Sequence, residues 1–118
     1  DINYETNYFS TRFNTTLHQW DDVDYKDDIE NLFALCSHLD LVIQVNNASI
    51  HIASALGKNV WAIILSGAQD FRWFYSGNDS NCAWYRNTKL FRQHDNETLS
   101  KVITNISAEL NKWLINHD

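Results

Sequence analysis

The chain has 118 residues, of which 44% are hydrophobic and 14% aromatic, and its formal net charge is −6. So many apolar and aromatic side chains exclude a disordered chain, because their burial can offset the entropy lost on ordering, and the length suits one compact domain. The acidic balance provides no overall field that would attract nucleic acid or an anionic membrane, so any bound anion must be held locally.

Signals for export or membrane insertion are missing from the sequence. It contains no apolar run of about 18 residues and no signal-peptide pattern. The two cysteines, Cys36 and Cys82, do not have C-x-x-C spacing and fit a reducing setting. We therefore expect a cytoplasmic protein with no membrane span.

The first elements along the chain have signals of unequal strength. Residues 4–12 place aromatic side chains at helix-like spacing, and residues 16–20 (TLHQW) could form a short strand. A clearer helix follows, with Asp27 or Asp28 available as its N-cap. Its apolar side chains keep the 3.6-residue period of a helix with one buried stripe: Ile29, Leu32, Phe33, Cys36 and Leu39.

Two apolar, β-branched segments are predicted to be buried strands. LVIQV (41–45) is nearly continuous, as in a parallel strand that is covered on both faces, and VWAIIL (60–65) has the same character. Residues 49–56 between them are predicted to form a helix that ends at Gly57, because glycine readily adopts the left-handed conformation found at helix ends.

The remaining elements complete an alternation of helices and strands. A long loop (66–87) follows the second strand, and TKLFRQ (88–93) is a possible third strand. A last helix is predicted to begin near Asn96, with one apolar face: Leu99, Val102, Ile103, Ile106, Leu110, Trp113 and Leu114. This alternation predicts an α/β fold, a Rossmann-like parallel sheet flanked by helices, with residues 1–118 in a single domain.

A polar break separates the first predicted strand from the next helix. A helix that begins there presents backbone N–H groups without partners and about half a positive charge, which favour phosphate. Ligands of open α/β sheets lie beyond the carboxyl ends of the strands. The candidate site residues are therefore Asn46, Asn47, Ala48, Ser49 and His51, with Ser49 as a suitable cap. Alternatively, these polar residues only cap the helix.

The loop that follows the second strand combines cations with aromatic rings. Its basic residues are Arg72 and Arg86, followed by Lys89 and Arg92, against only Asp70 and Asp79. Such a mixture can bind phosphates or stack on bases, although most of the rings are expected to pack the loop onto the sheet instead. Arg72, which follows the carboxyl end of a strand, is the best functional candidate among these residues.

Other signatures of chemistry are missing. With glycine only at 57, 67 and 77, neither G-x-G-x-x-G nor a P-loop can be written, which disfavours dinucleotide dehydrogenases and P-loop ATPases. The five histidines form no H-x-x-x-H pair. Asp22 and Asp24 spell D-x-D, a possible metal motif, but we interpret them as part of a solvated acidic loop. No metal site is predicted.

Two stretches of the sequence resemble one known family. LDLVIQVNNASIHIASALGKNVWAII (39–64) resembles a segment in the C-terminal half of heptosyltransferase-like glycosyltransferases, family nine, which are often fused to tetratricopeptide repeats. DFRWFYSGNDSNCAWYRNTKLFRQ (70–93) resembles the succession D-W-R-W, W-Y-P-s and l-F-R-Q of the same group. Together the two matches lie within a resemblance that covers about residues 27–115.

The resemblance implies a GT-B architecture, in which two Rossmann-like halves bind a donor between them. The donor, a nucleotide-diphosphate sugar, is held mainly by the C-terminal half. The positions that match the donor-binding motif are Asn46, Asn47, Ala48 and His51, and Glu5 matches a ribose-binding glutamate. The family usually has Asp-Thr in place of Asn46 and Asn47, and an amide accepts less strongly from sugar hydroxyls than a carboxylate.

The resemblance also implies what these 118 residues do not contain. The acceptor site and the catalytic base of the family belong to an N-terminal GT-B half, so the chain is predicted to be a fragment of a longer protein and inactive alone. The leading hypothesis is the donor-binding domain of a metal-independent, inverting glycosyltransferase without a cofactor. The alternatives are a degenerate GT-B half that acts as a non-enzymatic scaffold and half of a sugar-nucleotide epimerase.

Overall fold

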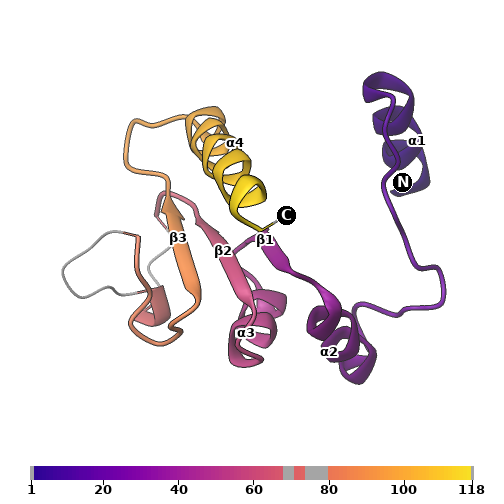
Figure 1. Ribbon diagram of the computed structural model, residues 1–118, viewed down its shortest axis with the longest axis horizontal. Coiled ribbons are helices and arrows are strands. Elements are labelled where there is room, and N and C mark those ends of the chain that lie inside the picture. Colours follow the sequence, from indigo (N-terminus) through magenta and orange to yellow (C-terminus); the bar gives the residue numbers. More distant parts are fainter. Residues whose placement is uncertain (1, 68–70, 74–79, 118) are drawn as a thin grey trace.

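The computed structural model describes residues 2–67, 71–73 and 80–117, which form a parallel sheet between layers of helices (Figure 1). The helices are α1 (Ile2–Phe13), α2 (Ile29–His38), α3 (Ala48–Ala55) and α4 (Leu99–Asn116), with a short 3-10 helix, η1 (Phe71–Trp73). The strands are β1 (Leu41–Val45), β2 (Asn59–Ile64) and β3 (Thr88–Arg92). The predicted α/β class is therefore confirmed, in a Rossmann-like arrangement.

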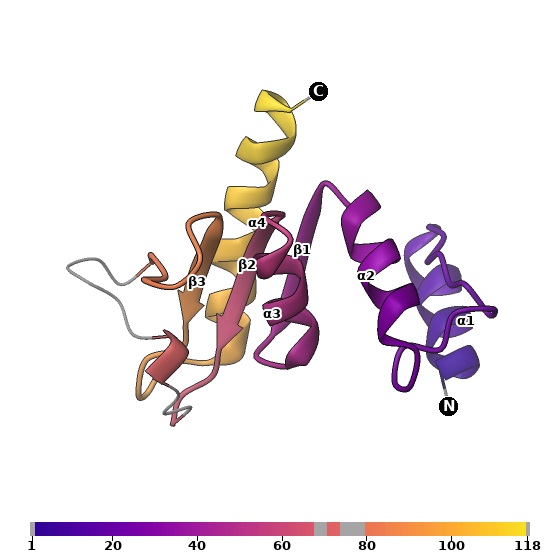
Figure 2. The ribbon, with the colours of Figure 1, turned by 90° about the horizontal axis from the view of Figure 1, so that it is seen from below.

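The three strands lie in sequence order, β1-β2-β3, and both pairs are parallel. β2 is the central strand: Val60 pairs with Val42 of β1 on one side and with Thr88 of β3 on the other. α3 lies on one face of the sheet and α4 on the opposite face, as Figures 1 and 2 show. The carboxyl ends of all three strands consequently meet at one edge of the sheet.

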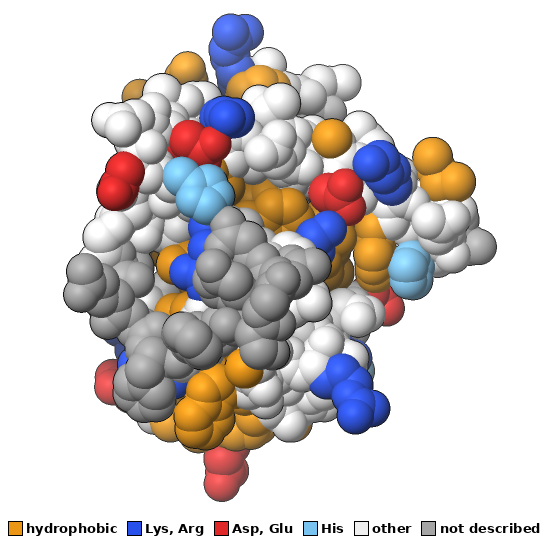
Figure 3. Space-filling model, turned by 90° about the vertical axis from the view of Figure 1, so that its left-hand side faces the viewer, with side chains coloured by type: hydrophobic (Ala, Val, Ile, Leu, Met, Phe, Trp, Pro, Cys, Tyr) orange, Lys and Arg blue, Asp and Glu red, His pale blue; other side chains and the backbone are white. Residues whose placement is uncertain are grey.

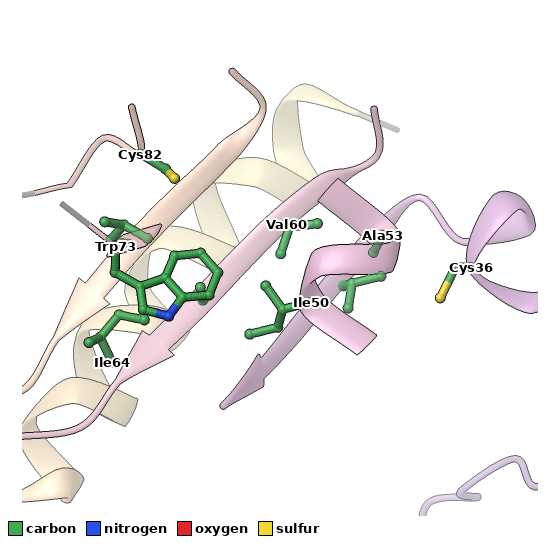
Figure 4. Packing of buried hydrophobic residues seen from close by; sticks show 10 residues of the cluster. Cys36, Ile50, Ala53, Val60, Ile64, Trp73 and Cys82 are labelled. Carbon is green, nitrogen blue, oxygen red and sulfur yellow. The ribbon is translucent and has the colours of Figure 1, made fainter. Parts of the chain in front are cut away.

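Alternate residues of β2 face two separate cores, which explains why this strand is almost continuously apolar. Val60, Ala62 and Ile64 pack with Ile50 of α3 in the first core, where the indole of Trp73 also lies (Figure 4). Trp61 and Ile63 belong to the second core, beneath α4. A strand that is buried on both faces is typical of a parallel sheet covered by helices.

α4 covers its face of the sheet with fewer residues than its sequence pattern predicted. Val102 and Ile106 are buried and Leu110 and Trp113 are partly buried, whereas Ile103 is 48% exposed and Leu99 and Leu114 are also exposed. The described residues therefore leave part of the apolar face of this 18-residue helix uncovered.

An ion pair links this helix to the edge strand β3. The Lys89 ammonium lies 2.9 Å from the Glu109 carboxylate. Hydrogen bonds from Lys89 and then from Lys112 lower the pKa of Glu109, so this carboxyl stays ionised at a more acidic pH than an unpaired glutamate does.

The ends of α3 follow rules of backbone chemistry. Gly57 has a φ of +74°, which confirms the predicted left-handed glycine after the helix. The Gly57 and Lys58 N–H groups donate to the carbonyls of Ser54 and Ala53, the pattern of a Schellman motif. At the other end the N-cap is Asn47, whose side chain accepts from the Ser49 N–H, so the prediction of Ser49 as the cap is wrong. An Asx side chain reaches the amide two residues on, which places the cap before Ala48.

The N-terminal part of the chain lies away from the sheet. α1 is at the end of the long axis opposite β3, with α2 between it and the sheet (Figures 1 and 2). α2 is capped by Asp28, one of the two predicted caps, and it buries Cys36 while Ile29 and Phe33 stay exposed. The predicted strand at residues 16–20 is wrong: the segment has no regular structure, and it pairs with none of the strands in the described sheet.

β1 departs from the predicted strand that is covered on both faces. Val42 is buried in the first core, but Leu41 and Ile43 are only partly buried and Val45 is 43% exposed. β1 is an edge strand of the described sheet, so β2 flanks it on one side only.

None of the described helices combines the length and the apolar character needed to span a bilayer.

A buried pair of hydroxyls joins α3 to β3 and yields a stability prediction. Ser54 Oγ and Thr88 Oγ1 are 2.8 Å apart and both residues are buried. Thr88→Val should lower the free energy of unfolding by about 1–3 kcal/mol, because it leaves the Ser54 hydroxyl buried without its partner. In urea denaturation, the double variant Ser54→Ala/Thr88→Val should lose less free energy of unfolding than the two single variants lose in sum. Strictly additive losses would show that the two hydroxyls do not depend on each other.

A candidate anion-binding pocket

Five of the predicted site residues line one pocket at the carboxyl end of β1. Its volume is ≈ 450 Å³ and its lining consists of Asn46, Asn47, Ala48, His51 and Arg72. The first four come from the turn between β1 and α3 and the beginning of that helix, whereas the arginine comes from η1, more than 20 residues later in the chain. The fold thus joins the polar break and the basic loop, which the sequence presents as separate candidates.

The backbone at the start of α3 determines how the pocket is built. The Asn46 N–H donates to the Ile63 carbonyl and ends the pairing of β1 with β2. The next residue turns the chain: the Asn47 side chain accepts from the Ser49 N–H at 3.0 Å. The other amides of the first turn have no acceptor within the helix and carry the positive end of its dipole. Ser49 itself is partly buried and does not line the pocket.

Two aromatic side chains hold His51 in place. Its Nδ1 atom is 3.0 Å from the Tyr85 hydroxyl. Its ring stacks on the Trp73 indole, with centroids 4.8 Å apart and an angle of 22° between the planes. His51 is partly buried. The imidazole therefore has a defined orientation at the pocket and does not behave as an exposed first-turn histidine.

The backbone of Arg72 and Trp73 is held by residues from later in the chain. The Cys82 thiol donates to the Arg72 carbonyl, and the Arg92 guanidinium donates to the carbonyl of Trp73. Trp73 is only 1% exposed and anchors η1 in the first core. The backbone beside Arg72 is consequently attached to the sheet, while its own side chain is exposed and lines the pocket.

Glu5 is not brought to the pocket. It lies on α1, at the far end of the molecule from η1 and β3 (Figures 1 and 2), and it is not among the lining residues. A carboxylate on that helix has no contact with the residues after β1 in the described structure, so the match of Glu5 to a ribose-binding residue has no geometric support.

The other loop residues have varied environments. Trp73 is buried and Tyr85 partly buried, as expected for rings that pack the loop onto the sheet, but Trp84 is 63% exposed. Arg86 lines a different hollow, next to Cys82. Four other residues of this loop lie outside the described residues: the two acidic ones, Asp70 and Asp79, and the aromatic Phe74 and Tyr75. On the face that carries β3, the coloured part of the surface has basic and acidic side chains interspersed with apolar ones (Figure 3).

The acidic D-x-D stretch has a structural role. Asp22 and Asp24 are exposed, as expected for a solvated loop. An Asp24 carboxylate oxygen accepts from the backbone N–H groups of Lys26 and Asp27. These bonds, the one from Asp27 first, lower the pKa of Asp24. Within the described ranges, no three His, Cys, Asp or Glu side chains gather as a possible metal site.

Sequence reasoning missed Tyr85 as a site residue. It treated this ring as one of many in an aromatic loop, and the bond to His51 spans 34 residues. No local spacing rule connects two positions so far apart. The available signal was the parallel sheet itself, because it brings the chain just before β3 alongside the helix that follows β1.

The fold and the pocket define the chain as an α/β domain with a candidate anion site at the carboxyl end of its sheet. No family model and no solved structure matches the chain. It is similar to Protein FlbA of Caulobacter vibrioides, with 30% identity over 91 residues, or 77% of this chain. The alignment spans only 14% of FlbA. The resemblance to heptosyltransferase-like glycosyltransferases therefore stays a prediction.

Proposed function

We propose that this domain binds the diphosphate of a nucleotide-diphosphate sugar and serves as the donor-binding half of a metal-independent, inverting glycosyltransferase. The observation that carries the proposal is that Arg72 of η1 lines the same pocket as His51 and the N-terminal end of α3. A volume of ≈ 450 Å³ lies within the range of about 300–1,000 Å³ typical of small-molecule sites.

The chemistry of sugar transfer explains why such a pocket would be useful. When the bond between the sugar and the diphosphate of the donor breaks, negative charge accumulates on the departing nucleoside diphosphate. Helix amides that lie in place beforehand, together with a guanidinium and an imidazole N–H, stabilise that charge without rearranging during the reaction. Arg72 suits this role because a guanidinium donates two parallel hydrogen bonds to a phosphate group.

In this proposal, the acceptor site and the catalytic base come from a second Rossmann-like half. The described residues offer no carboxylate among the lining of the pocket, and a base that deprotonates a sugar hydroxyl is required in an inverting reaction. The partner of this domain is accordingly an N-terminal GT-B half that closes over the donor.

A second candidate function is a scaffold that has lost catalysis. The observation that favours it is the role of Asn47, one of the two residues that differ from the family pattern. Its side-chain oxygen accepts from a backbone N–H as the N-cap of α3. Asn46 still presents a carboxamide, which can donate to a phosphate oxygen but cannot carry negative charge. A scaffold would keep the capped turn and bind no nucleotide.

A titration of the 118-residue chain tests the proposal. Inorganic pyrophosphate and UDP-, GDP- and ADP-sugars are added while NMR follows the backbone amides of residues 46–51. We expect saturable shifts, with an affinity that falls roughly 10- to 100-fold in Arg72→Ala, because a hydrogen bond to a charged group contributes about 1.5–3 kcal/mol.

The matched control is Arg86→Ala. It removes the same charge from the same basic loop but outside the pocket. An equal loss of affinity in both variants would show that the anion responds only to the overall charge of the loop and not to a contact in the pocket. The absence of any saturable shift would favour the scaffold.

A further inference from the structure

We propose that Tyr85 is a positioning residue for this pocket: its hydroxyl holds the His51 ring so that Nε2–H is the group that meets a bound anion. The inference rests on the proposed function, since it concerns the same pocket, but it adds a residue that does not line that pocket. Tyr85 acts through His51 and has no contact of its own with the ligand.

The geometry fixes the imidazole in two independent ways. The stacking contact with Trp73 defines the plane of the ring. The 3.0 Å bond between the Tyr85 hydroxyl and Nδ1 defines the rotation within that plane. The Tyr85 ring is itself tilted against both partners, with centroids 5.8 Å from His51 and 6.4 Å from Trp73. The three rings thus form one cluster beside the start of α3.

Tyr85 occupies a well-anchored segment of the chain. Its carbonyl accepts from the Thr88 N–H, and the Asn87 side chain donates to the Gly57 carbonyl at the end of α3. The buried Ser54–Thr88 hydroxyl pair adds a second link to the same helix. The Tyr85 hydroxyl is therefore held relative to α3, which is what a residue that orients His51 requires.

The chemistry of the bond determines whether His51 attracts or repels an anion. A neutral imidazole has one N–H and one acceptor nitrogen. If the Tyr85 hydroxyl donates to Nδ1, the proton of the neutral ring must be on Nε2, and a phosphate oxygen can accept it. The opposite tautomer would turn a lone pair toward the phosphate.

A tyrosine suits both charge states of the histidine. A hydroxyl can donate to the neutral ring and accept from the protonated ring, and Nε2 carries a hydrogen in both cases. A carboxylate in the same place would only accept, so it would put the proton of a neutral ring on Nδ1. The hydroxyl thus keeps a donor available to the anion whether or not His51 is charged.

The test compares the unchanged 118-residue chain with Tyr85→Phe. Nitrogen chemical shifts of the His51 ring, read from long-range proton–nitrogen NMR spectra at a pH where the ring is neutral, report the tautomer directly. We expect Nε2–H in the unchanged chain and a mixture of tautomers in Tyr85→Phe. The affinity for inorganic pyrophosphate should fall roughly 2- to 10-fold in the variant, as for the loss of one neutral hydrogen bond.

Tyr8→Phe is the control, since it removes a hydroxyl from the exposed ring on α1, far from the pocket. It should change neither measurement. Nδ1–H in the neutral ring of the unchanged chain overturns the role of Tyr85, even if Tyr85→Phe fails to fold. An unchanged affinity and tautomer in a folded Tyr85→Phe also overturn it. A lack of pyrophosphate binding by the unchanged chain, in contrast, overturns the proposed function itself.

Discussion

Replacing Trp73 with alanine should lower the free energy of unfolding by roughly 3–5 kcal/mol, which is the usual cost of removing a buried aromatic side chain. Trp73 is the largest of the fully buried side chains, although it lies in a short 3-10 helix and not in the sheet or a long helix. It packs in the first core with Ile50 and Ile64 and stacks on His51. Because the free energy of unfolding of such a domain is about 5–15 kcal/mol, this loss would leave a much larger fraction of the molecules unfolded.

Urea denaturation followed by circular dichroism measures this loss, and two further variants separate its causes. Trp73→Phe keeps an aromatic ring and removes an indole N–H that has no hydrogen-bond partner among the described residues, so its cost should be well below that of alanine. Trp84→Ala removes a tryptophan of the same loop that is 63% exposed and should change stability by less than about 0.5 kcal/mol. Equal losses at positions 73 and 84 would contradict the assignment of Trp73 to the core.

If the domain binds a nucleotide-sugar donor as we propose, replacing His51 with alanine should slow sugar transfer by the longer protein roughly 10²- to 10³-fold and weaken donor binding by the domain. The expected factor is that for removing one positioned hydrogen-bond donor from a site that stabilises developing negative charge. His51 lines the pocket beside the first turn of α3. The effect on transfer should exceed the effect on binding, because the charge on the diphosphate grows as the bond to the sugar breaks.

Calorimetric titration with the donor and steady-state kinetics of the longer protein measure the two effects. His51→Gln should recover part of the loss, since the glutamine amide can donate a hydrogen bond. His38→Ala changes an exposed histidine on α2 that bonds to a carbonyl of its own helix, and it should have no effect. Because His51 also stacks on Trp73, the stability of each variant must be compared first. Unchanged donor binding in a folded His51→Ala would remove this residue from the site.

The elements of the fold were predictable where one local rule dominates. The apolar run at 41–45, the helix between the strands, and Gly57 after that helix were all correct because burial and backbone conformation leave few alternatives. The weak point was the N-terminal part of the chain. Residues 16–20 were predicted as a possible short strand, but a strand needs a partner, and the sequence of one segment does not reveal whether a partner is present.

The site was predictable to a smaller extent. The turn after β1 could be found because ligands lie at the carboxyl ends of parallel strands, and Arg72 because its charge follows such an end. The residue that caps α3 could not be predicted in the same way. Asn47 and Ser49 are only two positions apart, and both residue types are favoured as N-caps. The bond between Tyr85 and His51 depends on side-chain orientations across the fold, so no pattern within either segment contains it.

Two hydrogen bonds clip α3 to the chain just before and at the start of β3, and they lie one helical turn apart. His51 bonds to Tyr85 and Ser54 bonds to Thr88, so both bonds join residues that are 34 positions apart. Because both bonds attach the chain to the same helix, the spacing between positions 85 and 88 is fixed. After the insertion or deletion of one residue between them, only one of the two hydrogen bonds could form at a time. Loop grafts and insertions should therefore be directed to other parts of the chain, because the length of this short segment determines where Tyr85 lies relative to His51.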